Sequence, residues 1–421
     1  MGLPLACALA EHGAKVTVAD IDRQLVDRLE AGECPYDEEP GLPELLAALR
    51  PTGRLRATLD TASACSESDS VVVIVPAHLT PERDIDFSIL QSASRAVGQG
   101  LRRETLVVYE TTVSVGGTRR QLIPVLERAS GLRVGEDFLV AYSPERVKAN
   151  HVLSRLRDTP KVVGGFDRRS LERACDLYGR YLGAPIDDVG TLEAAEMTKL
   201  LGMLYRDVNI ALANEMAAFC ELAQVDFERV RSAANRDGEA HLLDPGIGVG
   251  GHCTPVYPYF LTRESRRLGL PQRLSEAARE INDLQPSRHV QRIESTWGPL
   301  ADVTVHVLGL GFRPGVKVDK FSPAYPLRTE LVQRGAHVTL SDPHYSHDEV
   351  RQAGFEPGTP EAARIVILNT AHPEYADLDL AEWRQAGVEL VLDGRNFWQP
   401  QAAEQAGLIY LGVGRGTDRT L

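Results

Sequence analysis

The chain has 421 residues, 43% of them hydrophobic and 25% charged, a composition typical of a globular protein with two or three domains. Its formal net charge of −13 argues against broad nucleic-acid binding. The longest apolar runs, such as 70–75, are too short to span a bilayer, and the N-terminus lacks the basic segment of a secretory signal. Six scattered cysteines without metal-binding spacing predict reduced thiols in a cytoplasmic protein and no metal site.

The first predicted unit starts inside a turn or a helix. Residues 9–20, LAEHGAKVTVAD, read as a helix end, a glycine turn, a strand and a terminal acid, Asp20. An acid at this point accepts the ribose hydroxyls of NAD, although a simple turn aspartate is the ordinary alternative and Arg23 leaves a phosphate contact open. Because no strand precedes this helix, only Gly2 remains as the last glycine of a G-x-G-x-x-G loop. We expect the true start to lie upstream, and a truncated, handicapped protein is the alternative.

Further strands alternate with helices along the first half of the chain. Apolar runs at 70–75, 105–108 and 138–141 predict parallel strands that are buried on both faces, with helices at 90–97 and 119–132 between them. In such sheets, ligands bind beyond the carboxyl ends of the strands. The polar groups that follow these three strands are Pro76-Ala77-His78, Glu110-Thr111-Thr112 and Ser143-Pro144-Glu145-Arg146.

The period then becomes helical. Residues 191–225 are rich in Ala, Leu, Glu and Met and contain no proline, which predicts one helix about 50 Å long that links domains and supports a dimer. Lys199 and Met203 are i,i+4 neighbours on it, and Arg206 lies close to the same face. A lysine in such a helix is ordinarily just solvated. A second helix is expected over 271–283.

Gly-Gly-His-Cys-Thr-Pro at 250–255 places Cys253 directly after a run of glycines. Glycines allow positive φ and a close approach of the backbone to a ligand. A thiol on such a loop suits a nucleophile that must reach a substrate carbon, whereas most single cysteines are buried small apolar residues. From spacing alone, both interpretations stay open.

The last third repeats the beginning. Residues 331–342, LVQRGAHVTLSD, match residues 9–20, and here the preceding strand is present at Val303–Leu308, followed by a glycine turn at 309–314. Two copies of one dinucleotide-binding βαβ half are therefore predicted. The expected fold class is α/β, with two Rossmann-like doubly wound domains joined by a long central helix, the first lacking its first strand. The expected domains are a cofactor-binding domain over 1–188, a helical domain over 189–288 and a substrate-binding domain over 289–421.

The motifs in order resemble the UDP-glucose/GDP-mannose dehydrogenase family over essentially the whole chain. They are YETTV at 109–113, SPERV at 143–147, EMTKL at 196–200, RDVNIALANE at 206–215, DPGIGVGGHCTPVYPYFL at 244–261, REIND at 279–283, SPA at 322–324 and DGRN at 393–396. The histidine before Cys253 and the Ala-Asn-Arg at 234–236 are most similar to the UDP-N-acetylmannosamine dehydrogenase branch.

The resemblance implies a two-step, NAD-dependent oxidation of sugar carbon six to a uronate, used for cell-surface polysaccharide or a natural product. It implies that Cys253 holds the carbon as a thiohemiacetal and then a thioester, because an aldehyde that must be oxidised again has to be retained. Lys199 would stabilise the oxyanion or relay its proton. Glu145 would activate the hydrolytic water, with Thr112 supporting it and lining the nicotinamide site.

The binding residues follow from the same resemblance and from the repeat. The expected NAD contacts are Gly2, Asp20, Arg23, Thr112 and Lys320. The expected UDP-sugar contacts are Arg146, Val147, Lys199, Met203, Arg206, Gly250, Phe312, Arg313 and Arg395. A homodimer or higher homo-oligomer is expected, with no nucleic acid and no membrane as partners.

Several positions depart from the family pattern. Met203 replaces an asparagine that bonds the substrate, and Tyr257 replaces an aspartate that joins the lysine in proton handling. Glu239 stands where an arginine of the partner subunit contacts sugar. The favoured substrate is UDP-N-acetylmannosamine or UDP-N-acetylglucosamine. The alternatives are a UDP-glucose 6-dehydrogenase and a truncated, inactive homologue that acts as a UDP-sugar-binding or scaffold protein.

Overall fold

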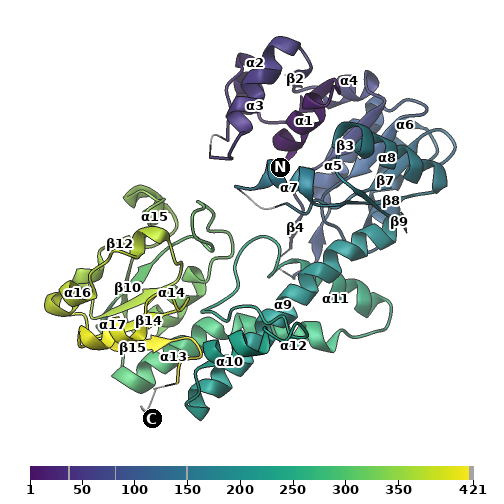
Figure 1. The fold of residues 1–421 in the computed structure, drawn as a ribbon. Coiled ribbons are helices and arrows are strands. Elements are labelled where there is room, and N and C mark those ends of the chain that lie inside the picture. Colours follow the sequence, from purple (N-terminus) through teal and green to yellow (C-terminus); the bar gives the residue numbers. More distant parts are fainter. Residues whose placement is uncertain (37, 81, 148–149, 417–421) are drawn as a thin grey trace. The chain divides into compact units, whose positions relative to one another are not determined.

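A computed structural model describes residues 1–36, 38–80, 82–147 and 150–416 (Figure 1). The chain divides into two compact units. The first consists of Met1–Gly202 together with Tyr259–Gly269, and the second consists of Met203–Pro258 together with Leu270–Leu421. No helix among the described residues is long and apolar enough to cross a membrane.

The first unit is built on a five-stranded sheet. Its order is β3 (Ser70–Val73), β6 (Leu106–Tyr109), β7 (Leu139–Tyr142), β8 (Lys161–Gly165) and β9 (Ile186–Thr191). The three predicted strands are confirmed with slightly shifted ends, and β6 and β7 are buried along their whole length, as their continuous apolar sequences require. The pairing of β7 with β8 is antiparallel, which the sequence did not predict.

Helices cover this sheet. They are α4 (Thr61–Ser66), α5 (Ser88–Gly100), α6 (Ile123–Ser130), which the π-helical turn η2 (Thr118–Leu122) precedes, α7 (Val152–Asp158) and α8 (Arg168–Tyr181). A short hairpin of β4 (His78–Leu79) and β5 (Ile85–Asp86) follows β3. The Ala77-His78 pair therefore leads into an antiparallel ribbon, which the parallel βαβ pattern did not predict.

A second, separate sheet belongs to the start of the chain. Helix α1 (Gly2–Glu11) leads into β1 (Val16–Ala19), which pairs in parallel with β2 (Leu55–Thr58), and α2 (Arg23–Ala31) and α3 (Leu42–Leu49) connect them. Helix α1 begins at Gly2, where a turn or a helix was expected. Among the described residues no strand is hydrogen-bonded to both β1 and β3. Val16 of β1 instead joins the apolar core of the larger sheet, together with Leu5, Leu9 and Val72.

The second unit contains the complete version of the repeat. Its parallel sheet has the order β12 (Glu356–Pro357), β11 (His337–Ser341), β10 (Thr304–Leu308), β13 (Ile365–Leu368), β14 (Leu390–Asp393) and β15 (Ile409–Gly412). The predicted strand at 303–308 is thus the central β10, between β11 and β13. The helices of this part are α13 (Gln285–Trp297), α14 (Ala324–Gln333), α15 (His347–Gln352), α16 (Leu380–Ala386) and α17 (Pro400–Gln405).

The long central helix is confirmed as α9 (Leu192–Ala223), whose 32 residues span about 48 Å. It is followed by α10 (Phe227–Ala234), α11 (Tyr257–Arg267) and α12 (Arg273–Asp283). The C-terminal half of α9 buries small residues such as Ala213 and Ala217 and exposes large apolar ones such as Phe219. One face of this helix therefore packs within the chain, and the other presents apolar surface.

Candidate active site

Two loops at the carboxyl ends of β6 and β7 are joined by backbone and side-chain hydrogen bonds. The Glu145 amide donates to the Glu110 carbonyl at 3.2 Å, and the Tyr142 hydroxyl donates to the Thr111 carbonyl at 3.1 Å. Thr112, buried, follows in the same loop. The segments singled out from the sequence as strand ends thus lie at one edge of the first unit's sheet.

Lys199 is directed at this edge. Its side chain is only 6% exposed, and its ammonium donates to the main-chain carbonyl of Glu145 at 2.5 Å. The carboxylate of Glu145 lies 4.0 Å from the same nitrogen. A lysine that helical periodicity would leave solvated is therefore buried against Glu145, and the structure brings these two predicted site residues together.

A buried ion pair lies under the same loops. The Lys161 ammonium contacts a Glu110 carboxylate oxygen at 2.8 Å, and the Tyr178 hydroxyl donates to that oxygen at 2.6 Å. Both charged side chains are almost fully buried, and burial raises the pKa of the Tyr178 phenol. The pair fixes the residue that precedes Thr111 and Thr112. Sequence reasoning missed Lys161 and Tyr178, for which a lysine at the start of an apolar strand was the only signal.

The expected cofactor residues lie around β1 and α1. Asp20 directly follows β1 and its carboxylate accepts a hydrogen bond from the Asp22 amide at 3.0 Å. Asp22 in turn caps α2, which begins at Arg23. Gly2 is the first residue of α1, and a Cβ atom there would lie 3.2 Å from Ile74, so this position permits a close backbone approach.

In the second unit, hydrogen bonds hold the glycine-rich loop that carries Cys253, residues 246–255 and here called the thiol loop, at several points. The Gly246 amide donates to the Asn214 side chain at 2.9 Å, and the Gly251 amide donates to the Lys320 carbonyl at 2.9 Å. The carbonyl of Cys253 accepts from the Tyr257 amide at 2.9 Å, at the start of α11. Cys253 is half-buried and is not in a disulfide.

Three of the loop's glycines are required by close contacts. A Cβ at Gly250 would lie 2.6 Å from Phe312 Cβ, and one at Gly251, where φ is +92°, would lie 2.7 Å from the Phe312 ring. A Cβ at Gly246 would meet the Arg395 guanidinium at 2.7 Å. The glycine run thus allows the loop backbone to pack against two residues of the Rossmann-like part of this unit.

The RDVN and REIND motifs hold the start of this loop. Asp207 of α9 pairs with Arg279 of α12 at 2.6 Å and accepts a bond from Asn282 at 2.9 Å. The Asn209 side chain donates to the His241 carbonyl and accepts from the Leu243 amide, both at 2.7 Å. Asp207 and Arg279 are buried, and hydrogen bonds of this kind between distant segments hold the backbone on the path that leads into the glycine run.

The other predicted residues are distributed over both units. The Arg395 side chain donates to the Asn369 carbonyl at 2.7 Å, and burial lowers the pKa of its guanidinium to about 10. The remaining members are Arg146 and Val147 in the first unit, and Met203, Arg206, Glu239, Tyr257, Arg313 and Lys320 in the second. The first unit thus holds Thr112, Glu145 and Lys199, while Cys253 belongs to the second.

The environment of Cys253 differs from that of the deeply buried cysteines. Burial raises the pKa of the Cys7 thiol to about 12 and that of the Cys65 thiol to about 11, so both are inert at neutral pH. Cys253 lies instead on a glycine loop, only partly buried. Its position, rather than its residue type, makes it the better candidate for a nucleophile.

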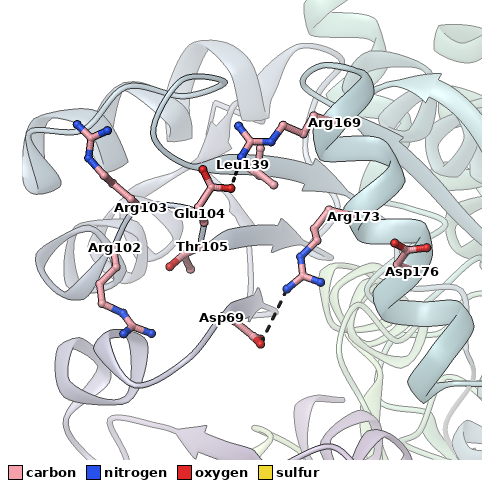
Figure 2. Close-up of a pocket in the computed structure, with 9 residues that line it drawn as sticks. All are labelled: Asp69, Arg102, Arg103, Glu104, Thr105, Leu139, Arg169, Arg173 and Asp176. Atoms are coloured by element: carbon pink, nitrogen blue, oxygen red, sulfur yellow. Dashed lines mark hydrogen bonds and ion pairs between the residues drawn. The ribbon is translucent and has the colours of Figure 1, made fainter.

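Two other polar groups do not form part of this site. A hollow of about 450 Å³ lies at the amino ends of β6 and β7, the edge opposite to Thr112. Figure 2 shows two of its four arginines paired, Arg169 with Glu104 and Arg173 with Asp69, the latter at 3.9 Å. In the second unit His344, His372 and Glu374 place ligand-type atoms within 4.8 Å of one another. Both ring nitrogens of His372 are already engaged in hydrogen bonds, with Asp342 and with the Gly315 amide, so this histidine serves the packing of its own loops.

The fold and these residues define a class: an α/β protein with two nucleotide-binding-type halves and a thiol on a glycine loop. Family models match three parts of the chain. The NAD-binding domain of the UDP-glucose/GDP-mannose dehydrogenase family covers residues 1–182, its central domain covers 193–284, and its UDP-binding domain covers 306–400. The chain therefore belongs to the UDP-glucose/GDP-mannose dehydrogenase family.

Individual relatives agree with this assignment. The chain is 32% identical to an NDP-N-acetyl-D-galactosaminuronic acid dehydrogenase of Ralstonia solanacearum, over 94% of both chains. It is 30% identical to a UDP-N-acetyl-D-mannosamine dehydrogenase of Pyrococcus horikoshii, over 99% of this chain and 97% of that one. A solved UDP-glucose dehydrogenase of Pyrobaculum islandicum superposes with a TM-score of 0.87 at 29% identity, covering 98% of this chain and 95% of that one.

The expected family and fold class are confirmed, and the chain is an NAD-dependent nucleotide-sugar dehydrogenase with an NAD-binding and a UDP-binding domain. The names of the similar proteins differ in the sugar that they specify, so the sugar must be inferred from the chain's own residues.

Proposed function

We propose that the protein oxidises carbon six of a UDP-N-acetylhexosamine to the uronate, with Cys253 as the nucleophile. The observation that carries the proposal is the thiol loop, whose glycines pack on Phe312 and Arg395 of the UDP-binding domain. A nucleotide held by these two residues would lie against the loop that bears the thiol. A guanidinium is well suited to phosphate oxygens, since it donates several hydrogen bonds in one plane.

The proposed chemistry assigns a role to each residue. Two hydrides leave carbon six in succession, and each would be accepted by one NAD molecule. Lys199, held at Glu145, stabilises the developing oxyanion at carbon six or relays its proton. Cys253 adds to the aldehyde, so that the second oxidation yields a thioester, and a water activated by Glu145 releases the carboxylate and regenerates the thiol. Thr112 supports Glu145 from the neighbouring loop.

Cofactor and substrate contacts complete the proposal. Asp20 would accept the ribose hydroxyls of NAD, with Gly2, Arg23, Thr112 and Lys320 as further contacts. The UDP-sugar would contact Arg146, Val147, Met203, Arg206, Gly250, Phe312, Arg313 and Arg395. We also propose three functional domains over 1–188, 189–288 and 289–421, and a cytoplasmic location.

The choice of sugar rests on residue chemistry. Met203 offers an apolar side chain where the family pattern has a hydrogen-bonding asparagine, and this suits the methyl of an acetamido group better than a hydroxyl. Relatives whose names specify N-acetylated sugars support the same choice. UDP-glucose remains the alternative, supported by the solved structure of the UDP-glucose dehydrogenase.

A substrate panel tests the function. We expect two NADH per sugar with UDP-N-acetylmannosamine or UDP-N-acetylglucosamine, measured by absorbance against the uronate formed, and a lower kcat/KM with UDP-glucose. Stoichiometric uronate from UDP-glucose alone would replace the N-acetyl assignment with the alternative. UDP binding without NADH from any UDP-hexose would favour a binding or scaffold protein.

We further propose a homodimer through the exposed face of α9. Tyr205, Leu212, Met216 and Phe219 recur at spacings of seven, four and three on this helix and are all exposed, Phe219 to 63%. A stripe of this kind is typical of a surface that a second helix covers.

The variant Phe219→Glu is expected to shift the protein from dimer to monomer in sedimentation velocity, because it buries a charge in the proposed interface. Val332→Glu is the matched control, since Val332 is also an exposed apolar residue, 51% accessible, but lies on α14. A monomeric unmodified protein, or a dimer that Phe219→Glu leaves intact, would contradict the proposed interface.

A further inference from the structure

Glu196 is a buried carboxylate next to the proposed catalytic residues and has no role in the scheme above. It lies in the first turns of α9 with a side chain that is not exposed to solvent. Its two oxygens accept hydrogen bonds from two backbone amides, that of Gly116 at 2.5 Å and that of Thr118 at 2.9 Å. Burying a charged group is costly. A buried carboxylate with a backbone hydrogen bond to each oxygen therefore calls for an explanation.

The two amides belong to the segment that follows Thr112. This segment turns sharply, with the Gly117 amide donating to the Ser114 carbonyl at 2.8 Å and with Gly116 at φ +77°. Thr118 then begins η2. The first amides of a helical segment have no partner within it, and they favour a negative charge. The Glu196 carboxylate supplies that charge and fixes the path of the loop.

Lys199 lies on the same helix as Glu196 and makes the contact with the second loop of the proposed site. It follows Glu196 by three residues, so both side chains leave the same side of α9, and both are buried in the first unit. Lys199 reaches the Glu145 carbonyl, while Glu196 reaches the loop beyond Thr112. One helical turn is therefore attached to both loops of the proposed site.

We propose that Glu196 is a positioning residue, whose ionised carboxylate sets Thr112 relative to Lys199 by binding the amides of Gly116 and Thr118. The inference rests on the proposed function for its catalytic consequence, but its structural part concerns only the first unit. An ionised carboxylate accepts both bonds, whereas a protonated one turns an O–H toward an amide donor. Activity should therefore require the ionised form.

The charges around Glu196 define when that form is present. The pKa of Glu196 is raised to about 7. Burial is the main cause of the increase and the Glu193 carboxylate adds to it, while the Thr118 side chain and the amides of Thr118 and Gly116 lower the pKa. Arg119, which pairs with Glu193 at 2.6 Å, also faces it. As pH falls through about 7, the Glu196 carboxylate takes up a proton and loses one of the two hydrogen bonds that it accepts from backbone N–H groups. We therefore expect kcat to fall on the acid side of neutrality.

The variant Glu196→Gln preserves the shape of the side chain but presents an NH₂ group to one amide. At pH 8 we expect kcat to fall about tenfold or more, with the KM for the UDP-sugar changed less than about twofold, since the loss concerns positioning rather than binding. The decline of kcat near pH 7 should disappear, because the titrating group is gone. A purely structural role would change stability and leave the pH profile in place.

Glu193→Gln is the matched control. It removes the same charge one turn earlier on α9, from a residue that is only partly buried and paired with Arg119. We expect a nearly unchanged kcat and a retained acid-side decline. Equal pH profiles for the unmodified protein and Glu196→Gln, or equal losses in both variants, would overturn the proposal.

A measurement on the unmodified protein keeps the test independent of activity and of how the variants fold. Amide hydrogen exchange of Gly116 and Thr118, corrected for the intrinsic rate, should be slower at pH 8 than at pH 6, while amides of β6 keep constant protection. Equal protection of the two amides at both pH values would refute the proposal that they bind the ionised Glu196 carboxylate. A protein without dehydrogenase activity that shows this pH dependence would refute the proposed function and retain the positioning contact.

Discussion

Cys253→Ser is expected to abolish net turnover, with kcat lower by about 10³-fold or more, while UDP binding stays within about twofold of the unmodified protein. A serine hydroxyl is a much weaker nucleophile than a thiolate, so the aldehyde would not be captured for the second oxidation. The change adds no bulk to the loop, and it leaves the contacts of Gly250 and Gly251 with Phe312 as they are. NADH formation measures turnover, and calorimetry with UDP measures binding.

The control for this experiment is Cys175→Ser. Cys175 is likewise only partly buried and outside any disulfide, but it lies on α8 in the first unit, whereas the glycine loop belongs to the second. Its variant should retain full turnover. Unchanged NADH production by Cys253→Ser would exclude the thiol as the nucleophile, and a parallel loss of UDP binding would mean that the loop, rather than the chemistry, had been disturbed.

Lys199→Met should lower kcat by about 10²- to 10⁴-fold with a small change in the KM for the UDP-sugar. Methionine keeps much of the apolar stem of the lysine but removes the ammonium that donates to the Glu145 carbonyl. The oxyanion at carbon six would then lose both its charge partner and its proton route. Steady-state kinetics with saturating NAD separates kcat from KM.

Lys15→Met is the corresponding control, because Lys15 is an exposed lysine just before β1 in the same unit. It should leave kcat unchanged. The thermal midpoint of Lys199→Met should stay within a few degrees of the unmodified protein, since a buried ammonium is replaced by an apolar group of similar length. A variant that keeps its kcat would remove Lys199 from the proposed scheme.

Local pattern was sufficient to predict the elements that carry the site. The apolar runs over β3, β6 and β7 have the period of buried parallel strands, and the proline-free α9 has helical period, so chain order placed Glu145 and Lys199 near strand ends and on a helix. The internal match between residues 9–20 and 331–342 predicted two related halves, and the second unit contains the full version with β10 at its centre.

Contacts between distant segments could not be predicted in the same way. Nothing in the sequence near Glu196 indicates that its partners are the amides of Gly116 and Thr118, because backbone donors carry no residue signature. The Glu110–Lys161 pair is likewise distant in sequence, and it forms only because β8 runs antiparallel to β7. Such contacts depend on tertiary pairing, which periodicity does not encode.

The separation between the β1–β2 pair and the five-stranded sheet bears on how the first unit opens. A strand in the interior of a sheet opens only with its neighbours, whereas β1 shares a backbone ladder with β2 alone. This pair can therefore behave as a cooperative unit of lower stability than β6 and β7, opening without loss of the rest of the unit. Asp20 follows β1. If NAD contacts Asp20 as proposed, its binding would oppose that opening and stabilise this part of the first unit.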